Sequence, residues 1–223
     1  TLLLALGFSK SDIVNEFYDS ENFKYDLKTN KWKTKFNPEN YKAKNFSEEV
    51  IDANNGKVVI KLGEKINFLN AKKLFDNGLK DILVSKESLF GKFLHKDIKI
   101  NEDENNTLKI GTELNDTIIQ QIIDSKVYDL QLSVTNSINK GPYLLTTIFN
   151  DKNNTKDEAI TEIYKMLRPG EPPTIEIATQ IFNNLFFSSD RYDLSDVGRV
   201  KMNSRLNLEC SDKITILRND DIT

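Results

Sequence analysis

Residues 159–187, AITEIYKMLRPGEPPTIEIATQIFNNLFF, set the fold of the last third of the chain. Apolar residues recur at helical spacing on both sides of a short segment, Arg168–Pro173, that holds three of the five prolines. Because a proline disfavours helix in the residue before it, the first helix is predicted to end at Pro169. Thr174 can cap the second helix. The sequence therefore predicts two helices joined by a rigid, proline-fixed corner.

The same segment marks a change in the use of basic residues. All five arginines lie from Arg168 onward, whereas the first 167 residues carry 24 lysines and no arginine. In a chain that uses lysine for generic positive charge, the remaining arginines indicate sites that need a planar guanidinium. Such forked donors suit phosphates, base edges and carboxylates. Pairing with the nearby acids Asp190, Asp193 and Asp196 is the alternative, and the sequence leaves both interpretations open.

Length and charge limit the classes of function. The 223 residues allow one or two domains, and 38% hydrophobic residues can supply a core. A net charge of -3 argues against a general polyanion-binding protein, which usually presents a basic face. Any contact with DNA is therefore expected to be local.

The residues that commonly carry chemistry are scarce. The single Cys210 and the single His95 exclude a disulfide framework and a Cys/His zinc site, and this usage is typical of a reduced, cytosolic chain. We interpret Cys210 as a small structural residue and His95 as a surface or partly buried side chain. The sequence has no glycine-rich phosphate loop and no nucleophile elbow, and its acids lack the spacing of a calcium loop. It predicts no active site.

The first part of the chain changes from helix to sheet. The apolar run Leu2–Leu6 is too short to span a bilayer and lacks the flanks of a signal peptide. It is predicted to be a helix ended by Gly7, and without an initiator Met we expect an excised fragment of a longer polypeptide. A capping box at Ser9–Asp12 predicts a second short helix. After Asp19, alternating apolar residues around the turn Thr29–Asn30 predict a β-hairpin.

Two segments in the middle of the chain resemble each other. Residues 57–84 and 105–132 match at a constant, ungapped offset of 48 residues. Each copy predicts a strand, a glycine turn, a helix and a strand. Since a unit of this size cannot bury its own apolar face, two copies packed on each other would form a compact α+β body. Chance similarity of two generic patterns is the alternative, and the packing prediction holds under both.

A polar stretch without periodicity, residues 150–155, is predicted to be a linker. Further on, residues 189–203, together with Arg205 just beyond them, mix basic and acidic side chains with few apolar ones. The basic residues there are Arg191, Arg199, Lys201 and Arg205. Two interpretations stay open: an internal ion-pair network that fixes the helix ends, or a surface that presents Arg and Lys to a phosphate backbone.

Three motifs in this part of the chain resemble one known family in their order and spacing. They are residues 163–174 (IYKMLRPGEPPT), 184–195 (NLFFSSDRYDLS) and 197–203 (VGRVKMN). The family is the β subunit of bacterial DNA-directed RNA polymerase, and weaker similarity covers the rest of the chain.

The resemblance implies an α+β fold with a discontinuous domain. Residues 1–19 and 156–223 are expected to form the mostly helical lobe, also called the β2 region. Residues 20–155 are expected to form a lineage-specific insertion within the lobe, an α+β module with short strands, a hairpin and the duplicated unit.

The resemblance also implies a function. In this family the lobe forms one wall of the downstream DNA cleft and lies against single-stranded nontemplate DNA and downstream duplex. The chain is therefore expected to be a noncatalytic part of a nucleotidyltransferase, without a cofactor of its own, because the catalytic Mg belongs to the β′ subunit. Carried over residue by residue, the motifs imply DNA contacts at Arg168, Arg191, Arg199 and Lys201, with Arg205 as a further candidate.

Expected partners are DNA and the polymerase β′, α, ω and sigma subunits, with no membrane, in the cytoplasm, and the isolated chain is expected to be a monomer. A different class of function is a stand-alone interaction module whose arginine-rich tail binds an acidic partner. A small hydrolase that uses Asp and Glu would need carboxylates that converge in a pocket, and the sequence shows no such cluster.

Overall fold

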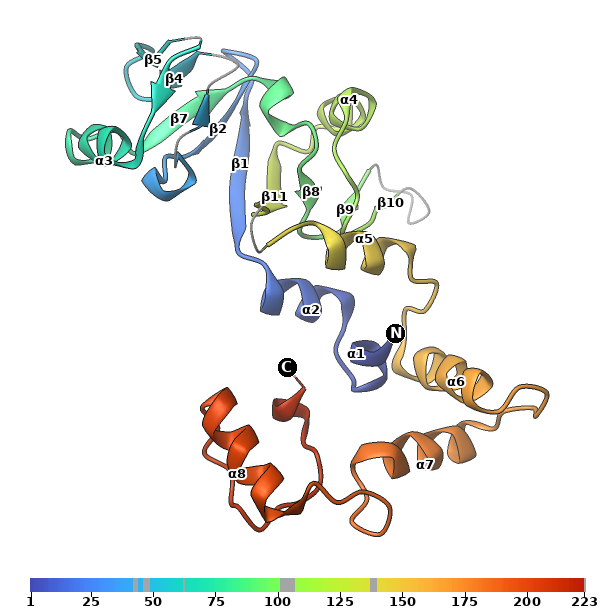
Figure 1. Cartoon of the computed structure of the whole chain (residues 1–223). Helices are drawn as coiled ribbons and strands as arrows, with labels where there is room; N and C mark the ends of the chain where they lie inside the picture. Colours follow the sequence, from blue (N-terminus) through green and yellow to red (C-terminus); the bar gives the residue numbers. More distant parts are fainter. Residues whose placement is uncertain (42–43, 46–48, 62, 101–106, 137–139, 223) are drawn as a thin grey trace. The chain divides into compact units, whose positions relative to one another are not determined.

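The computed structural model describes residues 1–41, 44–45, 49–61, 63–100, 107–136 and 140–222 (Figure 1). Helices and a seven-stranded antiparallel sheet confirm the α+β fold class. Two compact units divide the chain: unit 1 comprises Thr1–Ile13 and Asp151–Thr223, and unit 2 comprises Val14–Asn150. The assignment of a lobe and an insertion, with their boundaries, stays a prediction.

Unit 1 contains the predicted corner between two helices. α6 (Lys156–Leu167) ends just before it, and α7 (Ile175–Phe186) begins just after it. The Thr174 side chain accepts a hydrogen bond at the start of α7, as predicted. At the start of α6, Thr155 and Glu158 form a capping box. Side-chain caps therefore fix where both helices begin: Thr155 with Glu158 for α6, and Thr174 for α7.

A small core holds the helices of unit 1 together. α6 packs against α7 and against α1 (Leu2–Ala5), the predicted first helix, which Gly7 follows with a φ of 105°. Helix α8 (Ser195–Leu206) and the 3-10 helix η3 (Asn219–Asp221) complete the unit. The buried apolar residues of α1, α6 and α7 are Leu4, Ala5, Ala159, Ile160, Tyr164, Ala178 and Phe182.

Unit 2 is organised around the seven-stranded sheet, whose order is β5-β4-β7-β2-β1-β11-β8. The strands are β1 (Ser20–Asp26), β2 (Lys31–Lys35), β4 (Val50–Asp52), β5 (Val58–Ile60), β7 (Asp81–Val84), β8 (Phe93–Leu94) and β11 (Asp129–Ser133). The predicted hairpin is confirmed, because β1 and β2 pair directly with Phe23 opposite Thr34 and Tyr25 opposite Trp32. At the other side of the hairpin, Ser20 of β1 lies opposite Ser133 of β11.

Shorter elements surround this sheet. They are the strand pairs β3 (Lys44–Asn45) with β6 (Lys65–Ile66) and β9 (Ile98–Lys99) with β10 (Thr107–Leu108), the helices α3 (Phe68–Asp76), α4 (Asp116–Asp124) and α5 (Tyr143–Asn150), and the 3-10 helices η1 (Pro38–Tyr41) and η2 (Lys86–Leu89). Helix α2 (Lys10–Phe17) is the predicted second helix, and the chain passes from unit 1 to unit 2 within it.

The two similar segments fold alike. Helices α3 and α4 each have nine residues and begin 48 positions apart, and their caps Asn67 and Asn115 each accept a hydrogen bond from the amide three residues later. The glycine turns are also equivalent, with a φ of 75° at Gly63 and 81° at Gly111. A strand precedes each turn and another follows each helix. The predicted strand, turn, helix and strand are therefore present in both copies.

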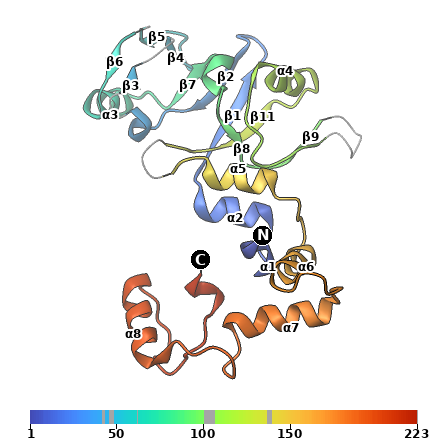
Figure 2. The same ribbon diagram turned by 45° about the vertical axis from the view of Figure 1, so that its right-hand side comes forward.

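The two similar segments do not pack directly on each other, unlike the arrangement predicted from the sequence. Strands β7 and β11 flank the β1–β2 hairpin, and Figures 1 and 2 show α3 toward the β4–β5 end of the sheet and α4 toward the β8 end. One core still joins them, because the hairpin residues Phe23 and Trp32 belong to the same buried cluster as Ala71 of α3 and Ile119 of α4. The hairpin, which lies outside the matching segments, completes the core that the copies share.

His95 is part of this interior. Its side chain is 2% exposed, so the surface or partly buried position inferred from the sequence is wrong. Nδ1 lies 3.0 Å from Ser133 Oγ and Nε2 lies 2.9 Å from Asn15 Oδ1. Since the amide oxygen only accepts, Nε2 carries the proton and Nδ1 accepts from the Ser133 hydroxyl. His95 directly follows β8, so its neutral imidazole connects the end of this strand to α2 through Asn15 and to β11 through Ser133.

This burial predicts a pH-dependent stability for unit 2. Burial, and then the charge of Lys96, lower the pKa of His95 from 6.5. The unfolded chain therefore binds the proton more tightly, so this stabilisation is present above pH 6.5 and is lost as the pH falls toward the folded-state pKa. Urea unfolding followed by the fluorescence of Trp32, the single tryptophan, should show the loss between about pH 7.5 and about pH 5.5. His95→Gln should remove that part of the pH dependence, and an equal fall in both proteins would refute the role of His95.

Candidate nucleic-acid interface

The corner between α6 and α7 presents Arg168 to solvent. The Tyr164 hydroxyl donates to Glu171 Oε2 at 2.9 Å, and Arg168 Nη1 lies 3.4 Å from the same oxygen. The Tyr164 hydrogen bond, followed by that of Arg168, holds the pKa of Glu171 below 4.5. The Arg168 side chain is 54% exposed, and such a surface pair contributes little to stability. Its guanidinium therefore lies where a polyanion can reach it.

Arg191 lies in the turn that follows α7. The backbone amides of Arg191 and Tyr192 both donate to the Ser188 carbonyl, at 3.1 and 2.9 Å. The Tyr192 ring packs edge-on against Phe186 with ring centroids 6.0 Å apart. Arg191 itself is exposed. Backbone and aromatic contacts thus fix the turn, and the Arg191 side chain is available at the surface.

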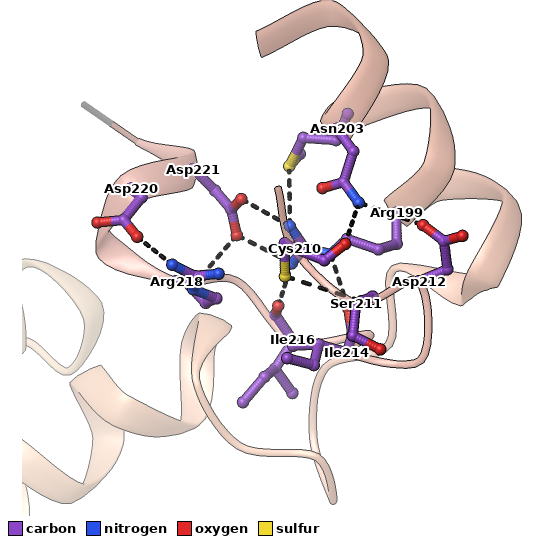
Figure 3. A network of polar contacts seen from close by, with 11 residues as sticks. Arg199, Asn203, Cys210, Ser211, Asp212, Ile214, Ile216, Arg218, Asp220 and Asp221 are labelled. Carbon is purple, nitrogen blue, oxygen red and sulfur yellow. Dashed lines mark hydrogen bonds and ion pairs between the residues drawn. The ribbon is translucent and has the colours of Figure 1, made fainter. Parts of the chain in front are cut away.

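Arg199 lies on α8 in a different environment. Its side chain has no exposed surface, and Nη1 and Nη2 lie 2.6 and 2.9 Å from the two carboxylate oxygens of Asp221 (Figure 3). The guanidinium also donates to the carbonyls of Ile214 and Ile216, the former from Nε at 2.7 Å. Such two-point, charge-assisted pairs are among the stronger hydrogen-bonded contacts. The structure therefore gives Arg199 an internal role, which argues against the DNA contact predicted for it.

The partner of Arg199 also differs from the acids suggested by the sequence. Asp190, Asp193 and Asp196 are near in sequence, but Asp221 is 22 residues away. Burial of the Asp221 carboxyl acts to raise its pKa, and the hydrogen bonds from Arg199 and from the Arg218 amide outweigh this and hold it below 3.8. Asp221 is thus a buried carboxylate that stays ionised.

A C-terminal strap, defined as residues 208–222, is attached to both neighbouring helices. Near α8, the Leu194 amide donates to the Thr215 carbonyl at 2.7 Å, and Asn203 Nδ2 donates to the Cys210 carbonyl at 2.7 Å. Near α7, the Leu217 amide donates to the Phe186 carbonyl at 3.0 Å. Backbone hydrogen bonds and the Arg199 ion pair therefore set the position of α8 within unit 1.

Lys201 and Arg205 lie on the part of α8 that the strap leaves open. Both are exposed, beside the apolar Val197 and Val200, which are 65% and 48% exposed. Of the five predicted DNA-contacting residues, one is buried and four are exposed at the corner, in the turn after α7 and on α8. No local sequence pattern distinguishes the buried Arg199 from the exposed Lys201. The burial of Arg199 depends on the strap, which begins beyond the end of the helix.

One shallow groove runs along α7 and has a volume of about 580 Å³. Its lining side chains are mostly polar: Ile175, Glu176, Thr179, Gln180, Asn183 and Asn184. Within the described ranges, no group of three or more His, Cys, Asp or Glu side chains could hold a metal ion. Of the helices described, none is long and apolar enough to cross a bilayer.

Comparison with known proteins gives one consistent result. Residues 114–223 match the family model described as RNA polymerase Rpb2, domain 2. The DNA-directed RNA polymerase subunits beta of Rickettsia felis and Rickettsia prowazekii are 41% and 40% identical over 222 residues. The corresponding subunit of Rickettsia canadensis is 41% identical over 223 residues. Each alignment covers all of this chain, which spans only 16% of the length of each relative.

The buried ion pair can be tested by removing its cation. Arg199→Met should lower the local unfolding free energy of α8 and the strap by about 3–5 kcal/mol, because Asp221 would stay buried without a partner. Arg218→Ala is the matched control. Arg218 pairs with Asp220, and their side chains are 39% and 59% exposed, so its loss should cost less than about 1 kcal/mol. Native-state hydrogen exchange of the amides in α8 measures both values. Similar losses in the two variants would show that the Arg199 pair does not hold the strap.

Proposed function

Because the chain belongs to the family of bacterial DNA-directed RNA polymerase β subunits, we propose that it lines the DNA cleft of such a polymerase as a noncatalytic wall. Residues 1–19 and 156–223 form the lobe in this proposal, and residues 20–155 form a module inserted into it. The lobe contacts promoter DNA and downstream DNA during transcription. The chemistry of nucleotide addition belongs to another part of the enzyme.

The observation that carries this proposal is the exposure of four basic side chains within the family motifs and just beyond them. Arg168, Arg191, Lys201 and Arg205 are exposed on unit 1. Arginine can bind a phosphate through two parallel hydrogen bonds, and lysine can bind it as a point charge. The internal pairing of Arg199 supports the same surface indirectly, because it holds the helix that carries Lys201 and Arg205.

The weak overall charge fits a local role. A chain with a net charge of -3 offers no general attraction for DNA, so its contacts depend on single side chains. Each phosphate that is neutralised adds a small, salt-dependent increment to affinity. The isolated chain is therefore expected to bind DNA with low affinity. The rest of the polymerase supplies most of the cleft.

The remaining parts of the proposal follow from this assignment. The partners are DNA and the β′, α, ω and sigma subunits, and the catalytic Mg belongs to the β′ subunit. The chain has no cofactor of its own and works in the cytoplasm, and the isolated chain is a monomer.

The proposal can be tested by promoter kinetics with polymerase that carries Arg168→Ala or Arg191→Ala in its β subunit. Loss of a phosphate contact should shorten the lifetime of the open complex and reduce the slope of log affinity against log salt by about one. Lys24→Ala is the control, because Lys24 lies in unit 2 with its side chain 72% exposed. Unchanged promoter kinetics in both variants would refute these DNA contacts, and a destabilised β subunit would then assign the two arginines a role in the stability of the lobe.

A further inference from the structure

Helices α3 and α4 provide an internal comparison between two surfaces. They hold equivalent positions in the two copies of unit 2, with the same length and the same kind of cap. Each contributes its inward residues, Ala71 from α3 and Ile119 from α4, to one buried core. Their packing into the core is therefore alike. Their other neighbours differ, because α3 packs against η1, whereas Asp116 of α4 pairs with Lys86 of η2 at 2.6 Å.

The outward residues differ strongly. Phe68 and Leu69 of α3 are 38% and 66% exposed, whereas the equivalent residues of α4 are Asp116 and Thr117. Phe75, near the end of α3, is 43% exposed. Two basic residues of α3 also differ, because Lys72 and Lys73 are exposed where α4 carries Gln120 and Gln121.

These α3 residues lie close together on the helix surface. Residues three, four or seven positions apart share one face of a helix, so Phe68 lies beside Lys72 and Phe75, and Leu69 lies beside Lys72 and Lys73. The result is an apolar patch with a charged border, which we call the α3 face: Phe68, Leu69, Lys72, Lys73, Phe75 and Asp76, so that two lysines stand against one acid. Because α4 carries the exposed Thr117 at the position of Leu69, packing of the helix on the core does not require an apolar residue there. An exposed apolar cluster with a polar border is typical of a site for protein binding.

We propose that the α3 face binds an acidic amphipathic helix of a partner protein. The apolar residues would supply the buried centre of such an interface and the lysines its charged rim, which is the usual anatomy of a protein interface. An acidic partner is favoured because the rim carries two lysines against one acid, Asp76, and complementary charge speeds association and fixes orientation. The apolar face of a partner helix would cover Phe68 and Leu69, as in other helix-binding sites.

Two other occupants fit the same residues less well. Single-stranded nucleic acid binds through stacking on aromatic rings along a basic groove, and the most exposed apolar residue here is the aliphatic Leu69. A helix that binds a membrane surface combines a long apolar face with many basic residues, whereas α3 has nine residues. The combination of a compact apolar centre and a short basic rim favours a protein helix.

The test uses the full chain and a designed probe. The probe is a fluorescent peptide of about four helical turns, with leucines along one face and glutamates on the others. Binding is measured by fluorescence anisotropy. The variant carries Leu69→Thr, Lys72→Gln and Lys73→Gln, which gives α3 the residues that α4 has at the equivalent positions. Thr117→Ala on α4 is the matched control, and circular dichroism shows that each protein is folded.

The expected result is binding with a dissociation constant in the micromolar range, weakened at least about tenfold by the triple variant and unchanged by Thr117→Ala. Weaker binding at high salt is expected from the lysine rim. Absence of peptide binding to the natural chain, or equal binding to the triple variant, would overturn the proposal. The same holds if an oligonucleotide or an anionic phospholipid vesicle, and not the peptide, binds in a manner that the triple variant abolishes.

Discussion

The end of unit 1 depends on one buried ion pair. Arg199 and Asp221 have no exposed side-chain surface, so each charge is tolerated only because the other compensates it. Helix α8 offers few apolar residues to the interior, and the pair, together with the carbonyls that Arg199 binds, takes the place of an apolar core. This arrangement is directional, because a guanidinium donates its hydrogen bonds only in its own plane. It therefore fixes the rotation of α8, and with it the side of the helix on which Lys201 and Arg205 are exposed.

Unit 2 shows the opposite relation between residue type and position. There, aromatic and aliphatic residues of α3 lie at the surface, whereas a charged residue of unit 1 lies inside. The rule that charged residues lie outside and apolar residues inside thus fails once in each unit. In unit 1 the buried charge attaches the strap, and in our proposal for α3 the exposed apolar residues bind a partner. The similarity of the two segments makes the second case visible, because α4 packs on the same core with polar surface residues.

Local features of the fold could be predicted from the sequence, since they depend on residues within about one helical turn of each other. The proline corner, the cap at Thr174, the β1–β2 hairpin and the helix and strand of each copy are examples. The order of the sheet could not be predicted, because strands of two or three residues carry almost no pattern and their partners are distant in sequence. The burial of His95 and the partner of Arg199 were missed for the same reason: the residues that bind them lie 80 and 22 residues away.

The pairing of β1 with β11 has a consequence for how the chain is built. Ser20 and Ser133 lie opposite each other, and the Val134 amide donates to the Asp19 carbonyl at 2.8 Å. The chain thus enters and leaves the sheet at neighbouring points, about one interstrand spacing apart. A host protein that carried this sheet in a loop would need only a narrow gap between two of its own residues, whatever the length of the segment between them. The cost falls on folding instead, because the first and last strands must meet across more than a hundred residues before the β1 edge of the hairpin is paired.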